Sequence, residues 1–85
     1  MRGLSFTEKA HIQFKEWEFT DKKIRVKIIK LLNEIVESPF TGIGKPEPLK
    51  HQLKGCWSRR INREHRLVYQ VTKDAIIVIS CKFHY

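Results

Sequence analysis

Residues 20–39 read TDKKIRVKIIKLLNEIVESP and carry the clearest periodic pattern in the chain. Apolar residues recur at intervals of four, three and four, which is the spacing of one helical face. They are Ile24, Ile28, Leu31 and Ile35. Thr20 and Asp21 are suitable N-cap residues, and Ser38 with Pro39 stops the pattern. The pattern predicts an amphipathic helix that must lay its apolar face on another surface.

The preceding residues predict a second amphipathic helix, from Thr7 to Phe19. Its apolar residues recur at four, four and three, and Ser5 with Glu8 fits a capping box. The apolar set is Phe6, Ala10, Phe14 and Trp17. Two helices joined within about three residues form an antiparallel hairpin. Residues 3–6 are short enough to supply an opening strand.

The second half of the chain predicts a sheet. Residues 39–55 hold all three prolines and three of the four glycines, so they cannot form one regular element. Three segments rich in Ile, Val, Tyr and Phe follow, separated by NREH and TKD. They are residues 57–61, 66–71 and 75–83. The last is apolar on both sides over residues 75–79, which indicates a strand near the sheet centre or under the helices. We expect an α+β fold with two amphipathic helices packed on a twisted antiparallel sheet of three or four strands.

Composition places the chain among single-domain, folded proteins, with residues 1–85 forming one domain. Of its 85 residues, 41% are hydrophobic, too many for a disordered chain, and the apolar runs are too short to span a membrane. A chain of this length buries only about 60% of the surface that it exposes when unfolded, which disfavours a deep cofactor cavity. The first residues show no apolar signal segment, so we expect a cytoplasmic protein with no cofactor and no membrane partner.

Positive charge gathers in the second half. The chain has 17 Lys and Arg against 9 Asp and Glu, a net charge of +8. Residues 1–38 carry +2 of it and residues 39–85 carry +6. Such an excess favours a polyanionic partner, either nucleic acid or an acidic protein.

The cysteines and histidines do not predict a metal site. Cys56 and Cys81 stand apart in apolar segments, and the four histidines lack paired ligand spacing. We expect two reduced, buried thiols, with a disulfide and a metal site as less favoured alternatives.

Several polar residues could carry chemistry. Glu47 lies between two prolines in KPEPLKH, which restricts its backbone. His84 follows directly on the last predicted strand, and Arg60 and Arg66 could flank a hairpin loop. Taken singly, Glu47 could be an ordinary loop acid, His84 an exposed polar end, and each arginine part of a solvated basic edge. Together, a carboxylate, a histidine and cations could supply the base, the acid and the phosphate contacts of metal-free RNA cleavage.

The chain also resembles a known family. The blocks GKPEPLKH, WSRRI, EHRLVY and FHY are similar to those of the YoeB toxins, messenger-RNA interferases of the RelE superfamily in bacterial toxin–antitoxin pairs. The resemblance covers nearly the whole chain, although the first helices match in pattern more than in letters. Cys56 stands where we expect an aromatic residue, and Phe83 where we expect Tyr. The likeness implies a RelE-like microbial ribonuclease architecture.

The resemblance implies a role for six residues. Glu47 would be the general base, His84 the general acid, and Arg66 the residue that stabilises the scissile phosphate. Lys50, Arg60 and Tyr85 would bind the substrate. It also implies a ribosome-dependent endoribonuclease that needs no metal, cleaves messages in the A site, forms a homodimer and is silenced by an antitoxin of the YefM type.

Strand parity gives a geometric expectation. If residues 62–64 and 72–74 are three-residue loops, Arg60 pairs with Arg66 and Arg66 with Ser80, and even-numbered residues share a face. His84 would then lie roughly 13 Å beyond Ser80 along a straight strand. We therefore predict a bend or a β-bulge that brings His84 towards Arg66.

Two other functions remain open from the sequence. The same fold also hosts toxins that inhibit DNA gyrase, so the chain could be a non-catalytic binding module. It could also be a generic basic RNA-binding domain that yields no fragments. The set Glu47, Arg66 and His84 favours the nuclease, because a binder needs no acid–base pair.

Overall fold

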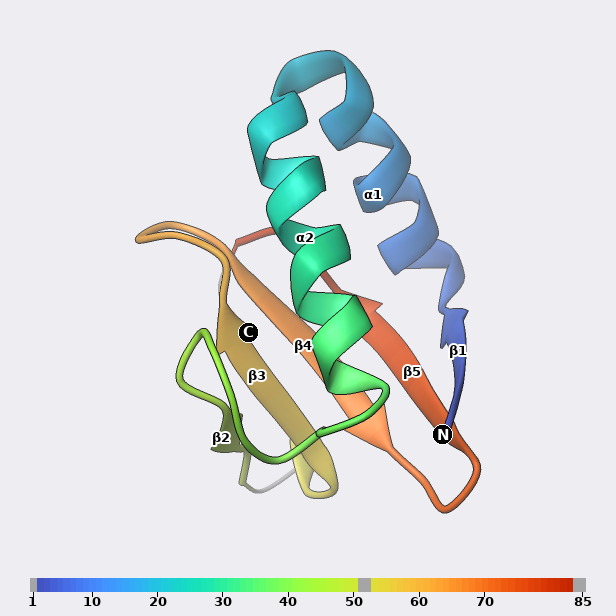
Figure 1. Cartoon of the computed structure of the whole chain (residues 1–85). Coiled ribbons are helices and arrows are strands. Elements are labelled where there is room, and N and C mark those ends of the chain that lie inside the picture. Colours follow the sequence, from blue (N-terminus) through green and yellow to red (C-terminus); the bar gives the residue numbers. More distant parts are fainter. Residues whose placement is uncertain (1, 51–52, 84–85) are drawn as a thin grey trace.

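A computed structural model describes residues 2–50 and 53–83. Within them two helices lie side by side on one face of a five-stranded sheet (Figure 1). The elements in chain order are β1 (Gly3–Phe6), α1 (Glu8–Thr20), α2 (Lys22–Ile35), β2 (Glu47–Pro48), β3 (Cys56–Arg60), β4 (Arg66–Val71) and β5 (Ala75–Ser80).

The sheet has the order β1-β5-β4-β3-β2. The predicted α+β class with two helices on a sheet is confirmed, and β5 is an interior strand, flanked by β1 and β4 and covered by the helices on one face. The expectation of a wholly antiparallel sheet of three or four strands is wrong. β1 pairs with β5 in parallel, and the two-residue β2 adds an edge beside β3. The four residues of β1 are compatible with a strand, but they do not indicate which strand pairs with it. That partner, β5, lies about 70 residues away in sequence.

The start of α1 differs from the predicted capping box. Thr7 is the N-cap, and its hydroxyl accepts a hydrogen bond from the backbone amide of Ala10 at 3.2 Å. Ser5 instead lies within β1 and pairs with Ile77. Strand pairing takes Ser5 out of reach of the helix, so the cap falls two residues later.

The second helix follows its sequence pattern closely. The Asp21 carboxylate accepts hydrogen bonds from the amides of Lys23 and Ile24, which confirms the predicted N-cap. The predicted apolar face is buried, together with Leu32. Each such Ile or Leu contributes about 1.5–3 kcal/mol when fully buried.

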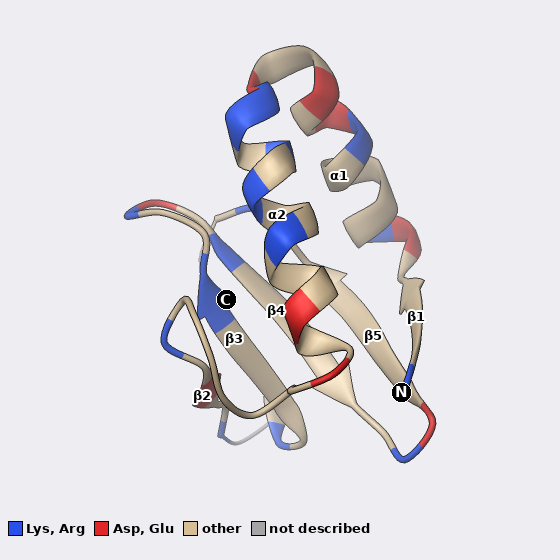
Figure 2. Ribbon diagram, viewed as in Figure 1, with Lys and Arg blue, Asp and Glu red and all other residues tan. Residues whose placement is uncertain are grey.

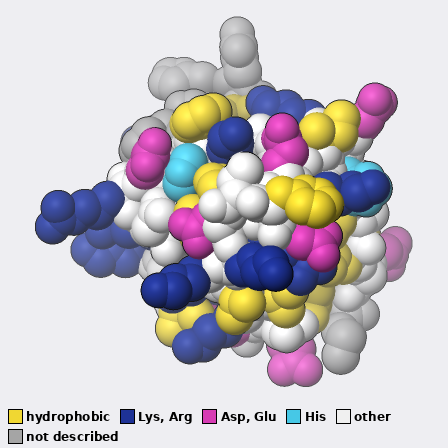
Figure 3. Space-filling model, turned by 90° about the horizontal axis from the view of Figure 1, so that it is seen from above, with side chains coloured by type: hydrophobic (Ala, Val, Ile, Leu, Met, Phe, Trp, Pro, Cys, Tyr) yellow, Lys and Arg dark blue, Asp and Glu magenta, His cyan; other side chains and the backbone are white. Residues whose placement is uncertain are grey.

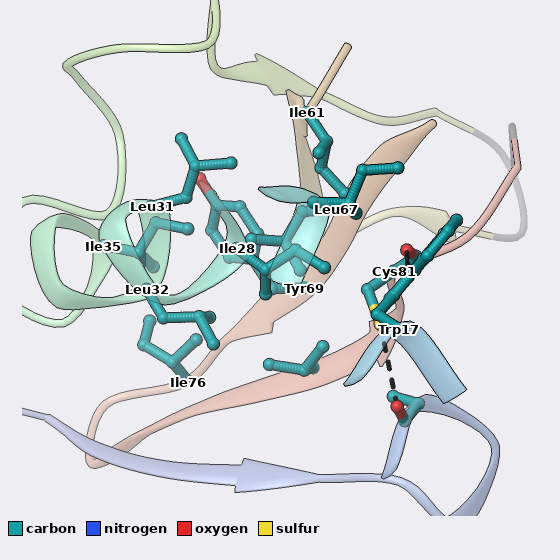
Figure 4. Close-up of a cluster of buried hydrophobic side chains, with 13 residues drawn as sticks. Trp17, Ile28, Leu31, Leu32, Ile35, Ile61, Leu67, Tyr69, Ile76 and Cys81 are labelled. Carbon is teal, nitrogen blue, oxygen red and sulfur yellow. Dashed lines mark hydrogen bonds between the residues drawn. The ribbon is translucent and has the colours of Figure 1, made fainter. Parts of the chain in front are cut away.

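One hydrophobic cluster lies between the helices and the sheet. Side chains of α2 meet Leu67 and Tyr69 of β4 and Ile76 of β5, and Trp17 of α1 lies beside Cys81 (Figure 4). Odd-numbered residues of β4 and even-numbered residues of β5 therefore face the helices. The expectation that even-numbered residues share a face across all three strands is wrong.

The β4–β5 turn explains that difference. The amide of Thr72 donates to the carbonyl of Ala75 at 2.9 Å, and Val71 pairs with Ile76, so only two residues form the loop. A two-residue loop shifts the pairing by one residue and exchanges the faces of β5. A bulge between Val68 and Tyr69 then shifts the pairing by one further residue in the same direction, so that Val68 pairs with Ser80.

Both cysteines are free and buried, as expected. Burial raises the pKa of Cys56 and raises that of Cys81 to about 12, so both thiols stay protonated and poorly nucleophilic. In the described parts of the chain, neither helix has the length and apolar character needed to cross a membrane.

Candidate active site

The face of the sheet turned away from the helices carries the charged residues singled out in the sequence. Antiparallel partners share a face, so Arg60 lies beside Arg66, and Glu47 lies in line with Ser58 and Val68. Figure 2 shows the basic residues at the adjoining ends of β3 and β4. At the end where α1 meets α2, by contrast, basic side chains are interspersed with acidic and apolar ones (Figure 3).

Glu47 and Arg66 come together across β3. Glu47 Oε1 lies 3.9 Å from Arg66 Nη1, with the Glu47 side chain 52% exposed and the Arg66 side chain 17% exposed. Because the Glu47 carboxylate is half-exposed, this ion pair contributes at most about 1 kcal/mol to stability. Removing the Glu47 charge should therefore leave the fold intact.

β2 holds Glu47 at the sheet edge. Glu47 pairs with Ser58 and Pro48 with Trp57, and the Leu49 amide donates to the Cys56 carbonyl at 2.9 Å. Proline has no amide hydrogen and is tolerated on an edge strand. The sequence did not predict this short strand, although it did predict a restrained Glu47 backbone.

A small apolar cluster packs beneath the charged residues. It contains Leu49, Cys56 and Val68, with Leu53 and Ile79 packed against it. Ser58 is fully buried between Glu47 and Val68 in the pairing. The strands that carry the charged residues are therefore packed against an apolar cluster, which limits the movement of their backbone.

Arg59 anchors the loop that leads to Glu47. Its side chain is fully buried and binds the carboxylate of Glu34 at 2.6 Å and the Tyr69 hydroxyl at 3.1 Å. Its guanidinium also donates to three loop carbonyls, those of Ser38, Thr41 and Ile43. Arg59 has an odd number, like Trp57 and Ile61, so strand alternation puts it on the same face as these apolar residues. That alternation could have predicted that Arg59 faces the helices.

The environment of Arg59 changes the pKa values of two neighbouring residues, Glu34 and Tyr69. The Arg59 guanidinium and the Ile43 amide hold the pKa of Glu34 below its ordinary value of 4.5. Burial raises the pKa of Tyr69, whose hydroxyl donates to the Pro39 carbonyl at 2.7 Å. This arrangement ties β3, β4 and α2 to residues 38–43.

The residues after β5 turn towards Arg66. α1 holds Cys81, because Gln13 Oε1 accepts from its amide at 2.8 Å and Trp17 Nε1 donates to its carbonyl at 3.0 Å. The Arg66 amide then donates to the Phe83 carbonyl at 3.0 Å. A register shift does occur, between Val68 and Tyr69, but the predicted pairing of Arg66 with Ser80 and a strand reaching Phe83 are wrong, because Ser80 pairs with Val68 and β5 ends at Ser80. The predicted approach of His84 to Arg66 concerns a residue outside the described part of the chain.

The structure thus gathers part of the predicted set. Glu47, Arg60 and Arg66 share one face, and Lys50 is exposed two residues beyond β2. His84 and Tyr85 lie outside the described residues.

His65, which no sequence motif marks as functional, borders this site. His65 is only 5% exposed, and its Nδ1 accepts a hydrogen bond from the Phe83 amide at 2.8 Å. His65 alternates in step with Leu67 and Tyr69, and this spacing could have predicted that it faces the interior.

Comparisons with known proteins identify relatives of this chain. Residues 6–85 match a family model described as the YoeB-like toxin of bacterial type II toxin–antitoxin systems. The chain is 49% identical over 82 residues to Toxin YoeB of Escherichia coli K12, covering 96% of this chain and 98% of that one. It is 45% identical to Toxin YoeB of Mycobacterium bovis over the full length of both chains.

Solved structures show the same relationship. A YoeB/ParE toxin from Agrobacterium tumefaciens superposes with a TM-score of 0.94 at 42% identity, covering 98% of this chain and 99% of the other. A YoeB dimer from Staphylococcus aureus gives 0.91 at 46% identity, covering 99% and 98%. A YoeB–YefM complex from the same organism gives 0.89 at 44% identity, covering 100% and 99%. The chain therefore belongs to the YoeB family, the toxins of bacterial type II toxin–antitoxin systems.

Proposed function

We propose that this toxin is a ribosome-dependent endoribonuclease that cleaves messenger RNA in the A site without a metal ion and so inhibits translation. The observation that carries the proposal is the pairing of a carboxylate and a guanidinium on the open face of the sheet. Glu47 and Arg66 lie 3.9 Å apart, and the Arg66 backbone binds Phe83, the residue that directly precedes His84.

Each step of 2′-hydroxyl attack has a candidate group. Glu47 accepts the 2′-hydroxyl proton as the 2′-oxygen–phosphorus bond forms. His84 gives a proton to the departing 5′-oxygen as the phosphorus–5′-oxygen bond breaks, leaving a 2′,3′-cyclic phosphate and a free 5′-hydroxyl. Arg66 stabilises the charge on the pentacoordinate phosphate.

Three further residues would hold the message. Arg60 lies beside Arg66 and is exposed, and Lys50 is exposed near Glu47 in the chain. Both would bind the phosphate backbone through charge. Tyr85 would hold the substrate next to the acid.

The partners follow from relatives. The Staphylococcus aureus structures contain a YoeB dimer and a YoeB–YefM complex, so we propose a homodimer and an antitoxin of the YefM type for this chain. The concentration of positive charge in residues 39–85 suits both RNA and an acidic antitoxin segment.

Primer extension on a translated message tests the proposal. Glu47→Ala, Arg66→Ala and His84→Ala should each slow cleavage by about 10²–10⁴-fold, the typical contribution of an acid, a base or a charge-stabilising group. Wild type should cleave equally well with a metal chelator present.

Lys73→Ala and Asp74→Ala are matched controls, because these charges are exposed in the β4–β5 turn at the other end of β4. Both should cleave like wild type. Fragments from all three active-site variants at the wild-type rate would refute the acid–base roles. Growth arrest with no fragments from wild type would point to a toxin that acts by binding alone.

A further inference from the structure

Phe83 is held by two consecutive residues at the start of β4. Its amide donates to His65 Nδ1 at 2.8 Å, and its carbonyl accepts from the Arg66 amide at 3.0 Å. Both backbone polar groups of Phe83 are therefore fixed by the segment that carries the proposed phosphate-binding arginine. The next residues along the chain are His84 and Tyr85.

The backbone of Phe83 needs such restraint. Its φ angle is 62°, in the left-handed region that aromatic residues rarely adopt. With no partner for its amide, this residue would relax towards extended backbone and redirect the chain that follows. The bond to His65 thus opposes a local conformational preference.

The surroundings of His65 fix its ring. The imidazole meets Trp17 edge-on, with ring centroids 4.7 Å apart, and lies 5.6 Å from the Phe83 ring. Trp17 is itself tied to the Cys81 carbonyl, and the Lys82 ammonium lies over both the Trp17 and Phe83 rings. The ring has little freedom to turn away from the Phe83 amide.

The contacts also define the state of the imidazole. A ring nitrogen accepts a hydrogen bond only when it carries no proton, so Nδ1 is bare and the proton resides on Nε2. Nε2 faces the Glu64 carboxylate at 3.7 Å, which suits a nitrogen that bears hydrogen.

We propose that His65 is a positioning residue, which through Nδ1 holds the Phe83 amide and so sets His84 and Tyr85 relative to Arg66. This inference rests on the proposed nuclease function. As a positioning residue, His65 contacts neither the message nor the reacting atoms. It acts through the backbone of Phe83, because a displacement of about 1 Å in a catalytic group can cost roughly 10²-fold in rate.

Two variants of nearly equal shape separate positioning from packing. Asn and Leu both branch at Cγ, but only Asn offers an oxygen, Oδ1, where His places Nδ1. His65→Leu should keep the apolar contacts with Trp17 and lose the bond to Phe83. His65→Asn should keep that bond and put a polar amide against the rings.

The expected orders of activity and stability are therefore opposite. In single-turnover cleavage of a translated message, His65→Leu should be about 10–100-fold slower with ribosome affinity within about twofold of wild type, and His65→Asn should be within about fivefold. In thermal unfolding, His65→Leu should be the more stable of the two. Cleavage that follows stability, or a folded His65→Leu with wild-type rate, would overturn the inference.

Two measurements on the wild-type chain are independent of any cleavage. Nitrogen-15 spectra of the imidazole should show the Nε2–H tautomer, and hydrogen exchange of the Phe83 amide should be at least about tenfold slower than in His65→Leu. An Nδ1–H tautomer or an unprotected Phe83 amide would refute the contact. If wild type failed to cleave any message, the nuclease proposal would fall, while these spectra would still decide whether His65 holds Phe83.

Discussion

Arg59 and Arg60 are neighbours in sequence and face opposite sides of the sheet. Arg59 is fully buried, and its guanidinium binds Glu34, Tyr69 and three loop carbonyls. Arg60 is exposed on the open face beside Arg66. One arginine builds the structure and the other is left available to an anion. The residue type is the same, and only the alternation of the strand assigns the two uses.

The largest contrast should appear when each arginine is replaced by Met. Arg59→Met leaves three loop carbonyls without their Arg59 donors and removes the buried charge that pairs with Glu34, which should lower the free energy of unfolding by about 3–5 kcal/mol. Arg60→Met should change it by less than about 0.5 kcal/mol, as at an exposed site. Urea unfolding of both variants measures the difference, and equal losses would contradict the assignment of Arg59 as the structural arginine.

A smaller contrast concerns two glycines with positive φ. A Cβ on Gly42 would lie 1.6 Å from Glu34 Oε1, whereas one on Gly55 would meet nothing within 4 Å. Both Ala variants carry backbone strain of about 1–3 kcal/mol, because φ is +124° at Gly42 and +91° at Gly55. Gly42→Ala also forces Glu34 away from Arg59, so it should be less stable than Gly55→Ala by about 1.5–3 kcal/mol, the value of a charge-assisted hydrogen bond.

Thermal or urea unfolding of that glycine pair provides the test. Glu34→Gln combined with each glycine variant serves as its control. If the clash with the carboxylate is the cause, the difference between Gly42→Ala and Gly55→Ala should shrink when Arg59 no longer binds a charged group. An unchanged difference would show that the charge of Glu34 plays no part in the loss.

The smallest expected effect is a pH dependence that arises from Glu34. Its pKa is lowered in the folded chain, so its charged form stabilises the fold above the ordinary value of 4.5. That stability is lost as the pH falls below 4.5 and through the lowered folded value. The advantage of wild type over Glu34→Gln in melting temperature should therefore be full at pH 7 and shrink in this acidic range.

Glu37→Gln is the matched control for that titration. Glu37 is an exposed carboxylate in the turn after α2, so it corrects for the change in net charge. A wild-type advantage over Glu34→Gln that stayed constant from pH 7 to pH 3 would show that the Arg59 contact does not depend on the charge of Glu34.

Local patterns predicted the elements and part of the site. The spacing of apolar residues correctly predicted which face of α2 packs on the sheet, and Asp21 is the N-cap, as expected. The hairpin between β3 and β4 had the predicted pairing of Arg60 with Arg66. Glu47 and Arg66 were identified as members of one site, and they lie in contact distance of an ion pair.

Distant contacts were beyond those patterns. Periodicity reports which side of an element is apolar, but it does not report which strand lies alongside, so the parallel pairing of β1 with β5 was missed. The loop between β4 and β5 was one residue shorter than expected, because the Thr72 hydroxyl and backbone close the turn onto Ala75.

The sequence alone determined the helices, the strands after residue 55, the two buried thiols and the family resemblance, because each of these follows from composition, spacing or short motifs. Tertiary structure decided that Arg59 is internal, that His65 binds Phe83 and that Glu47 meets Arg66 across β3. These are contacts between residues 10 or more positions apart or across a turn. Their geometry depends on one register, one bulge and one loop length, and a single-residue change in any of them would turn the same side chains to the other face.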